Sequence, residues 1–186
     1  MREIVGMILG GLGIAANAII FQQKTGKRLL VWKLISDVLW ASYYVALGGY
    51  SGAAIALIGI LRESIFLNQG KRWADSKLWL LLFAGLSVLS AALTWQSAMS
   101  ILPAVASLLS VFGFWRARPM LSRVLAYPIS GCMLTYDIVA LGRGGVMGIV
   151  NESITLASTT FALIVAFIGR RRAAKAESRK ASGDEG

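Results

Sequence analysis

Seven stretches of apolar residues, separated by short polar or glycine-containing connections, occupy most of the chain. Each stretch is close to the 17 to 25 residues that an α-helix needs to cross the hydrocarbon core of a bilayer. We therefore expect an all-α membrane protein with seven transmembrane helices. The expected spans are Ile4–Phe21, Leu29–Gly48, Tyr50–Leu67, Leu78–Trp95, Ala98–Trp115, Val124–Leu141 and Gly145–Ile168.

Basic residues gather in every second connection between these spans. They follow the first, third, fifth and seventh spans, whereas the turns after the second and fourth have none and the turn after the sixth has only Arg143. Because short basic loops are poorly translocated, we expect this side to face the cytoplasm, with the N-terminus outside and the C-terminus inside. The basic residues of this side are Lys24, Lys27, Arg28, Lys33, Lys71, Arg72, Lys77, Arg116, Arg118, Arg123, Arg170, Arg171, Arg172, Lys175, Arg179 and Lys180.

The composition agrees with a multi-pass membrane protein and argues against several other classes. A hydrophobic content of 56% would leave a soluble protein with far too much exposed apolar surface. The net charge of +10 follows from the one-sided loops, which would meet anionic lipid headgroups, so we expect no nucleic acid partner. The chain has no histidine and a single cysteine, Cys132, so we expect no metal site, no cofactor and no enzymatic activity.

The two halves of the chain share a short internal repeat. Residues 44–48 (YVALG) match residues 138–142 (IVALG), and both runs lead through a glycine-containing turn into the next span. Together with the matching basic loops, the repeat predicts two parallel three-helix units, 1–70 and 98–172, joined by a loop and linker helix at 71–97. The segment 173–186 is rich in charged and small residues, and we expect a disordered cytoplasmic tail there.

Charged side chains inside the expected spans are the main candidates for function, since each costs roughly 2.5 to 3.5 kcal/mol at the centre of a membrane helix. Arg62 and Glu63 lie deep in the third span, and Asn151 and Glu152 lie in the seventh. We expect these four to face a polar cavity between the two units, where they bind a solute or relay protons. The alternative is a buried ion pair, with Glu152 as one possible partner of Arg62, that only fixes helix packing.

Other polar residues of the spans are weaker candidates for a functional site. Tyr136 in the sixth span and Tyr43 in the second are expected to line the path, and so is Asp137, although Asp137 is also close enough to the outer end to reach headgroup water. Lys33 and Asp37 are four residues apart, which predicts an intrahelical ion pair. Asn17 and the hydroxyl side chains of the spans are expected to hydrogen-bond between helices or to their own helix.

Two segments carry a resemblance to a known family. The stretch from Leu102 and Pro103 to Arg116, and the stretch from Gly142 to Ser153, resemble the YgjV-type family of bacterial inner-membrane proteins, and the likeness extends over most of the chain. It implies a multi-pass protein of the bacterial inner membrane, without a settled biochemical role.

The layout of three, one and three helices is also similar to that of SWEET and PQ-loop sugar transporters. This similarity implies hinges at Pro103 and Pro128, with Gly10 at the matching place in the first span. It also implies substrate contacts from Trp40 and Asn151, while the third span has Arg62 and Glu63 where those transporters have asparagine.

These patterns favour a transporter of a small polar solute, with its path between the two three-helix units. The alternative is a membrane scaffold or accessory subunit that does not transport and whose buried ion pairs are structural. Homo-oligomerisation is left open. A cavity at Arg62 and Glu152 that reaches solvent would favour transport, whereas a dry pair between arginine and glutamate would favour the scaffold.

Overall fold

The computed structural model describes residues 2–47, 50–93, 98–139 and 145–183. Within these ranges it does not describe the side chains of residues 2, 3, 47, 50–52, 54, 55, 91, 137, 145, 146, 173 and 175–183. The described part of the chain forms seven α-helices and one short 3-10 turn, with no strand, so the prediction of an all-helical protein is confirmed. The elements are α1 (Arg2–Ile20), α2 (Gly26–Leu47), α3 (Tyr50–Phe66), α4 (Lys77–Leu93), η1 (Ala98–Ser100), α5 (Ile101–Trp115), α6 (Pro119–Val139) and α7 (Gly145–Gly183).

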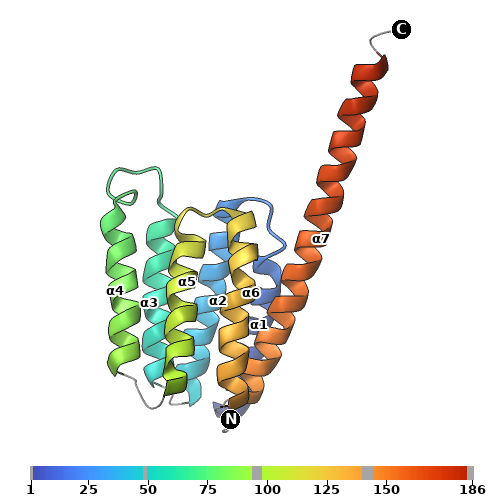
Figure 1. Cartoon of the computed structure of the whole chain (residues 1–186). Helices are drawn as coiled ribbons and strands as arrows, with labels where there is room; N and C mark the ends of the chain where they lie inside the picture. The colour runs from blue at the N-terminus through green and yellow to red at the C-terminus, as the bar shows by residue number, and fades with distance from the viewer. Residues whose placement is uncertain (1, 48–49, 94–97, 140–144, 184–186) are drawn as a thin grey trace.

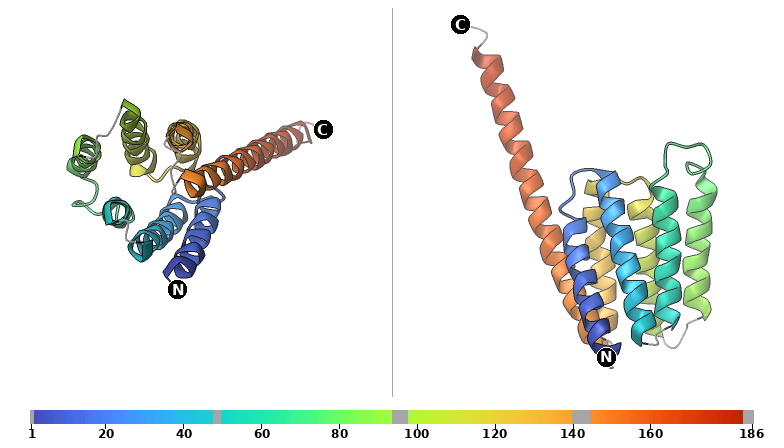
Figure 2. Two further views of the ribbon diagram at one scale, coloured as in Figure 1. Left: turned by 90° about the horizontal axis from the view of Figure 1, so that it is seen from below. Right: turned by 180° about the vertical axis from the view of Figure 1, so that it is seen from behind.

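The helices run antiparallel to their neighbours in sequence and are arranged around a ring (Figures 1 and 2). Within the first half, α1 packs on α2 and α2 packs on α3. Within the second half, α5 packs on α6 and α6 packs on α7. Helix α4 packs on α5, and between α3 and α4 the rings of Phe66 and Phe83 meet edge to face, 5.9 Å apart between centroids. Helix α7 returns to α1. The first and last helices of the bundle are therefore neighbours.

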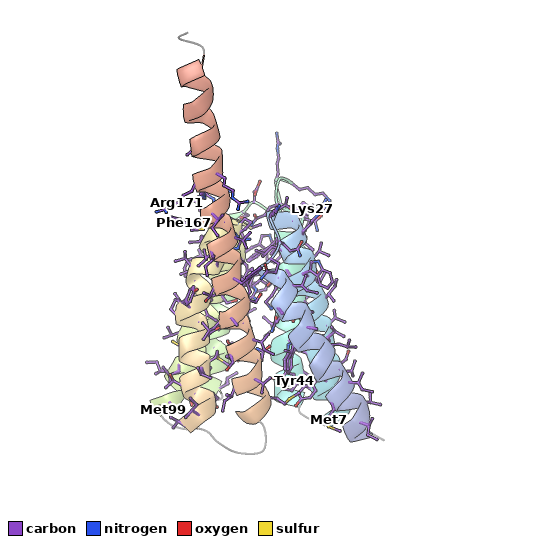
Figure 3. All side chains as sticks on the ribbon, turned by 90° about the vertical axis from the view of Figure 1, so that its right-hand side faces the viewer. Met7, Lys27, Tyr44, Met99, Phe167 and Arg171 are labelled. Carbon is purple, nitrogen blue, oxygen red and sulfur yellow. The ribbon has the colours of Figure 1, made fainter. Side chains whose placement is uncertain are left out.

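The connections from α1 to α2, from α3 to α4 and from α5 to α6 all lie at one end of the bundle, which we call the basic end (Figure 1). Figure 3 places Lys27 and Arg171 toward this end and Met7 and Met99 at the other, which we call the distal end. The connections that are rich in basic residues in the sequence therefore lie together at one end of the bundle.

Large buried apolar side chains concentrate at the basic end. They come from the ends of α1, α3 and α5, from the first turn of α2 and from the second turn of α4, because these turns meet there. Buried positions closer to the distal end hold small residues, including Gly10, Gly13, Ala41, Ala53 and Ala56. The apolar core consists of Ile20, Phe21, Leu29, Leu30, Phe66, Phe83, Val111, Phe114, Trp115, Ala126 and Ala162.

The outer surface of the bundle is strongly apolar, as expected for helices that contact lipid. Leu78 and Leu93 of α4 are 72% and 78% exposed, and Phe161 of α7 is 61% exposed. By length and hydropathy, three described helical segments are able to cross a membrane, namely Gly26–Ala46, Ala98–Trp115 and Met147–Arg172. Two more apolar helices, Ile4–Ile20 and Lys77–Ser90, are shorter.

Helix α7 differs from the sequence-based expectation at its C-terminal end. The helix continues to Gly183 and projects well beyond the basic end, whereas we expected a disordered tail from Ala173 (Figure 1). The reason is local, since alanine, lysine, arginine and glutamate are good helix formers. Extending an existing helix also avoids the cost of nucleating a new one.

Candidate functional site: a polar cavity inside the helix ring

A cavity of about 820 Å³ lies inside the ring and is partly open to the outside. It extends from Phe21 and Ser122 near the basic end to Tyr44, Leu93 and Ser100 near the distal end, so it runs along most of the bundle. All seven helices contribute to its wall. Its polar lining residues are Asn17, Lys33, Asp37, Arg62, Ser87, Ser90, Ser100, Ser107, Ser110, Ser122, Ser130, Tyr136, Asn151, Glu152 and Thr155, in addition to Trp40 and Tyr44.

One face of α2 supplies much of the charge and the aromatic surface of this wall. Lys33, Asp37, Trp40 and Tyr44 follow one another at helical spacing, which places them on the same side of the helix. All four line the cavity. The rings of Trp40 and Tyr44 lie 6.0 Å apart between centroids, so the aromatic part of this face is continuous.

Two ion pairs lie side by side between α2 and α3. Lys33 donates to Asp37 within α2, as predicted. In α3, the Nε and Nη2 atoms of Arg62 donate to Oε1 of Glu63 at 3.0 and 2.8 Å. Glu63 is fully buried and also interacts electrostatically with Lys33 and Asp37, so the two pairs form one network. The Lys33 ammonium lies 6.0 Å from the ring centroid of Phe114, which connects the network to the apolar core.

A chain of hydrogen bonds connects three helices at the level of Asn17. The Ser36 hydroxyl of α2 donates to Oδ1 of Asn17 at 2.9 Å. Nδ2 of Asn17 donates to Oδ1 of Asn151 at 2.8 Å, and Nδ2 of Asn151 donates to Oε1 of Glu152 at 3.1 Å. The orientation of the Glu152 carboxylate in α7 is therefore coupled to α1 and α2.

Three side chains of the cavity wall have buried polar atoms with no hydrogen-bond partner among the described residues. They are Oδ2 of Asp37, the hydroxyl of Ser130 and the hydroxyl of Thr155. Buried polar atoms are nearly always hydrogen-bonded, because an unmet bond costs about 1 to 3 kcal/mol. Two further atoms of this kind, Oε2 of Glu63 and the hydroxyl of Thr159, belong to residues that do not line the cavity, so unmet hydrogen bonds are not confined to its wall.

At the basic end, contacts between α6 and the end of α1 join the two halves. Arg123 of α6 donates from Nε to the carbonyl of Phe21 at 2.9 Å and from Nη2 to the carbonyl of Gln23 at 3.0 Å. The backbone of Gly26 lies so close to Ala117 that an added Cβ would approach the Ala117 carbonyl oxygen to 1.7 Å. Several residues of the apolar core, including Phe21, Phe83 and Phe114, also line the cavity.

The structure brings most of the residues that we singled out to the cavity, with two exceptions. Arg62, Asn151, Glu152, Trp40 and Tyr136 line its wall. Glu63 does not, because it is fully buried behind Arg62.

The second exception is Tyr43, whose ring packs against α1, where a Cβ added to Gly10 would come within 3.2 Å of it. The side chain of Asp137 lies outside the described part of the structure. The cavity face of α2 is thus made by Trp40 and Tyr44, and Tyr43 serves as a packing residue.

The three expected hinge residues occupy different environments. Pro103 lines the cavity in the first turn of α5, where backbone N–H groups have no intrahelical partner, so it does not interrupt the helix. Pro128 lies inside α6 and cannot donate to the carbonyl of Val124. Gly10 sits in a tight contact between α1, Tyr43 and Met147. Only Pro128 removes a hydrogen bond from the middle of a helix.

Four members of the cavity wall were not predicted as site residues from the sequence, namely Lys33, Asp37, Tyr44 and Asn17. We had assigned Lys33 and Asp37 to an intrahelical pair alone, and that pair turns out to line the cavity. For Lys33, Asp37 and Tyr44, the available signal was their helical spacing with Trp40 in the same span. The described residues contain no group of three histidine, cysteine, aspartate or glutamate side chains that would hold a metal ion.

Comparison with known proteins identifies a family. Residues 4–168 match the family model Imp-YgjV, which is described as a bacterial inner membrane protein. Neither a curated protein nor a solved structure matches the chain significantly.

Proposed function

Since the chain belongs to the YgjV family of bacterial inner-membrane proteins, we propose that it is a transporter of a small polar solute. The solute path is the cavity inside the helix ring, between the unit α1–α3 and the unit α5–α7. The observation that carries this proposal is the cavity of about 820 Å³, because its wall combines the ion pair of Lys33 and Asp37, the guanidinium of Arg62, two asparagines and a row of serines within an otherwise apolar bundle. Polar groups inside a membrane protein are costly and are typical of solute or ion pathways.

The proposed membrane arrangement follows from the charge distribution. Seven spans cross the bilayer, the basic end faces the cytoplasm and the distal end faces outward. The two three-helix units are parallel repeats, with α4 as the linker helix that gives them the same orientation.

A second candidate function is a membrane scaffold that does not transport. The observation in its favour is the pair between Arg62 and Glu63, in which Glu63 is completely buried and does not reach the cavity. Such a pair is able to fix helix packing without a ligand. In this reading, the basic helical extension of α7 would dock on anionic lipid or on a cytoplasmic partner.

Flux measurements on reconstituted protein separate the two functions. The purified full chain is incorporated into lipid vesicles, and the uptake of a panel of small radiolabelled polar solutes is compared with uptake by protein-free vesicles. A transporter gives uptake of at least one solute above the protein-free level, and Glu152→Gln lowers it because this carboxylate lines the path. Asp75→Asn is the matched control, since Asp75 is exposed in the connection between α3 and α4.

The scaffold function predicts a different result in the same flux measurement. If no solute enters faster than into protein-free vesicles, or if Glu152→Gln and Asp75→Asn both transport like the parent chain, the cavity is not a solute path.

A further inference from the structure

The boundary between α3 and α4, which we call the seam, is the most loosely packed part of the helix ring. Every other pair of neighbours around the ring packs closely, whereas the described backbones of α3 and α4 hardly approach each other. The aromatic contact between Phe66 and Phe83 joins them near the basic end. Helix α4 lies at the edge of the bundle and packs mainly on α5 (Figures 1 and 2). Toward the distal end, the two helices therefore lack close backbone packing.

The cavity extends to this seam. Ile58 of α3 lines it, and so do Leu86 and Leu93 of α4. Leu86 and Leu93 are seven residues apart, which places them on the same side of α4. Leu86 also follows Phe83 by three residues, and the ring of Phe83 meets Phe66 of α3. This side of α4 is therefore turned toward α3.

Leu93 marks the place where the cavity opens to the surface. It lines the cavity and is nevertheless 78% exposed. Leu86 lies two turns deeper, about 10 Å along the helix. The adjoining outer face of α4 is apolar and exposed, including Leu81 and Val88. The opening is thus continuous with a surface that contacts lipid when the helices span a bilayer.

The chemistry of the seam suits a hydrocarbon chain. Ile58, Leu86 and Leu93 present only methyl and methylene groups, which make the same dispersion contacts with a lipid chain as with each other. An apolar gap that stays empty loses these contacts on both of its sides. One turn away from Ile58 and Leu86, the cavity wall becomes polar at Arg62 and Ser90. A chain in the seam therefore has its polar end beside hydrogen-bonding groups.

We propose that the seam between α3 and α4 is a lateral binding site for the alkyl chain of a membrane amphiphile, whose polar end reaches the cavity at Arg62 and Ser90. The occupant enters from the bilayer and not from the aqueous phase. This inference goes beyond the proposed function and does not depend on it, since a scaffold would hold such a chain as well as a transporter.

Photolabelling in a bilayer tests this site. The full-length protein is placed in lipid nanodiscs with a monoacylglycerol whose chain ends in a diazirine, and the labelled residues are mapped by mass spectrometry. Chains in the surrounding lipid label the outer face of α4, at Leu81 and Val88, in proportion to the probe. Labelling of Ile58, Leu86 and Leu93 is expected to saturate. An excess of monoacylglycerol without the diazirine is expected to abolish it, whereas glycerol, which has no chain, is expected not to compete.

Variants that fill the seam distinguish it from the surface around it. Leu86→Trp adds bulk inside the seam, and Leu93→Trp adds it at the exposed opening, away from the apolar core. Each is expected to lower the saturable labelling of Ile58 by about tenfold. Leu81→Trp is the matched control, because it makes the same substitution on the outer face of α4, and it is expected to leave this labelling unchanged. Circular dichroism and gel filtration check that each variant is folded.

Three results would overturn the inference. The first is labelling of Ile58 that rises in proportion to the probe without saturating, or that glycerol abolishes. The second is saturable labelling that survives both Leu86→Trp and Leu93→Trp in folded protein. The third concerns a second copy of the chain, which is the other occupant that an apolar seam fits. In a Cys132→Ser background, a disulfide between two copies of the Leu86→Cys variant, formed by oxidation in the membrane, would assign the seam to an interface between copies.

Discussion

Asn17 of α1 donates a hydrogen bond of 2.8 Å to Asn151 of α7, and this contact joins the first and last helices of the ring. The two residues are 134 positions apart in the chain. Asn17 also accepts a hydrogen bond from Ser36, and Asn151 donates to Glu152, so the contact is the centre of a polar connection from α2 to α7. Its role is to hold the two halves together beside the cavity.

This contact predicts a measurable energetic coupling between α1 and α7. Asn17→Ala and Asn151→Ala are each expected to lower the free energy of unfolding, and the double variant is expected to lose less than the sum. The coupling energy is expected to be about 0.6 to 1.7 kcal/mol, the range of hydrogen bonds between membrane helices. Reversible unfolding in mixed detergent micelles, followed by circular dichroism, gives these values.

The control is Ser42→Ala combined with Ser153→Ala, since both hydroxyls are exposed and bond to carbonyls of their own helices. Their effects are expected to add. Strict additivity of Asn17→Ala and Asn151→Ala would contradict the contact.

Breaking the pair between Arg62 and Glu63 is expected to destabilise the protein severely. Arg62→Leu leaves the completely buried Glu63 carboxylate without its two donors, which costs about 3 to 5 kcal/mol. Replacing both residues by leucine removes the buried charge as well, so the double variant is expected to be more stable than Arg62→Leu. Thermal unfolding in detergent measures all three chains. A double variant less stable than Arg62→Leu would show that the pair contributes more than mutual charge compensation.

Gly59 is expected to be required for the position of Asp37. A Cβ added at Gly59 would lie 2.8 Å from Oδ2 of Asp37, so Gly59→Ala pushes the carboxylate away from α3. We expect a loss of about 1 to 3 kcal/mol in unfolding free energy from this overpacking, together with weaker solute binding. Gly85→Ala in α4 is the matched control, since an added Cβ there meets nothing within 4 Å. If Gly59→Ala is as stable as Gly85→Ala, the Asp37 carboxylate shifts without an energetic cost, and Gly59 is not required for its position.

Much of the fold was predictable because the signals are local. Each apolar run specifies a helix, and the helices α1 to α6 begin and end within a few residues of the expected spans. Helix α7 was predicted too short, since we ended it where the apolar residues end. A helix of alanine, lysine, arginine and glutamate needs no apolar face once it extends from an existing helix.

The candidate site was predictable only in part because its geometry depends on which way each helix faces. Buried charge identified Arg62 and Glu152, but the sequence does not tell which neighbour a face of α2 meets. We chose Tyr43 over Tyr44 for this reason. The packing of Gly10 against Tyr43 turns Tyr44 toward the cavity, and only the neighbouring helix α1 reveals this.

The proposed orientation in the membrane predicts labelling from opposite sides. In a Cys132→Ser background, Lys27→Cys places a thiol at the basic end and Met99→Cys places one at the distal end (Figure 3). A membrane-impermeant maleimide added to intact spheroplasts is expected to label Met99→Cys and not Lys27→Cys, and inverted vesicles give the opposite result. Labelling of both positions from the same side would contradict the topology.

The central claim, that solute passes through the cavity, is tested most directly by blocking it. In the Cys132→Ser background, Ser107→Cys places a thiol in the cavity wall, and Ser42→Cys places one on the exposed side of α2. Uptake of the solute identified by the panel is measured in vesicles before and after treatment with N-ethylmaleimide. Treatment is expected to stop uptake by Ser107→Cys and to leave uptake by Ser42→Cys intact. Uptake by fully labelled Ser107→Cys at the untreated rate would contradict the central claim.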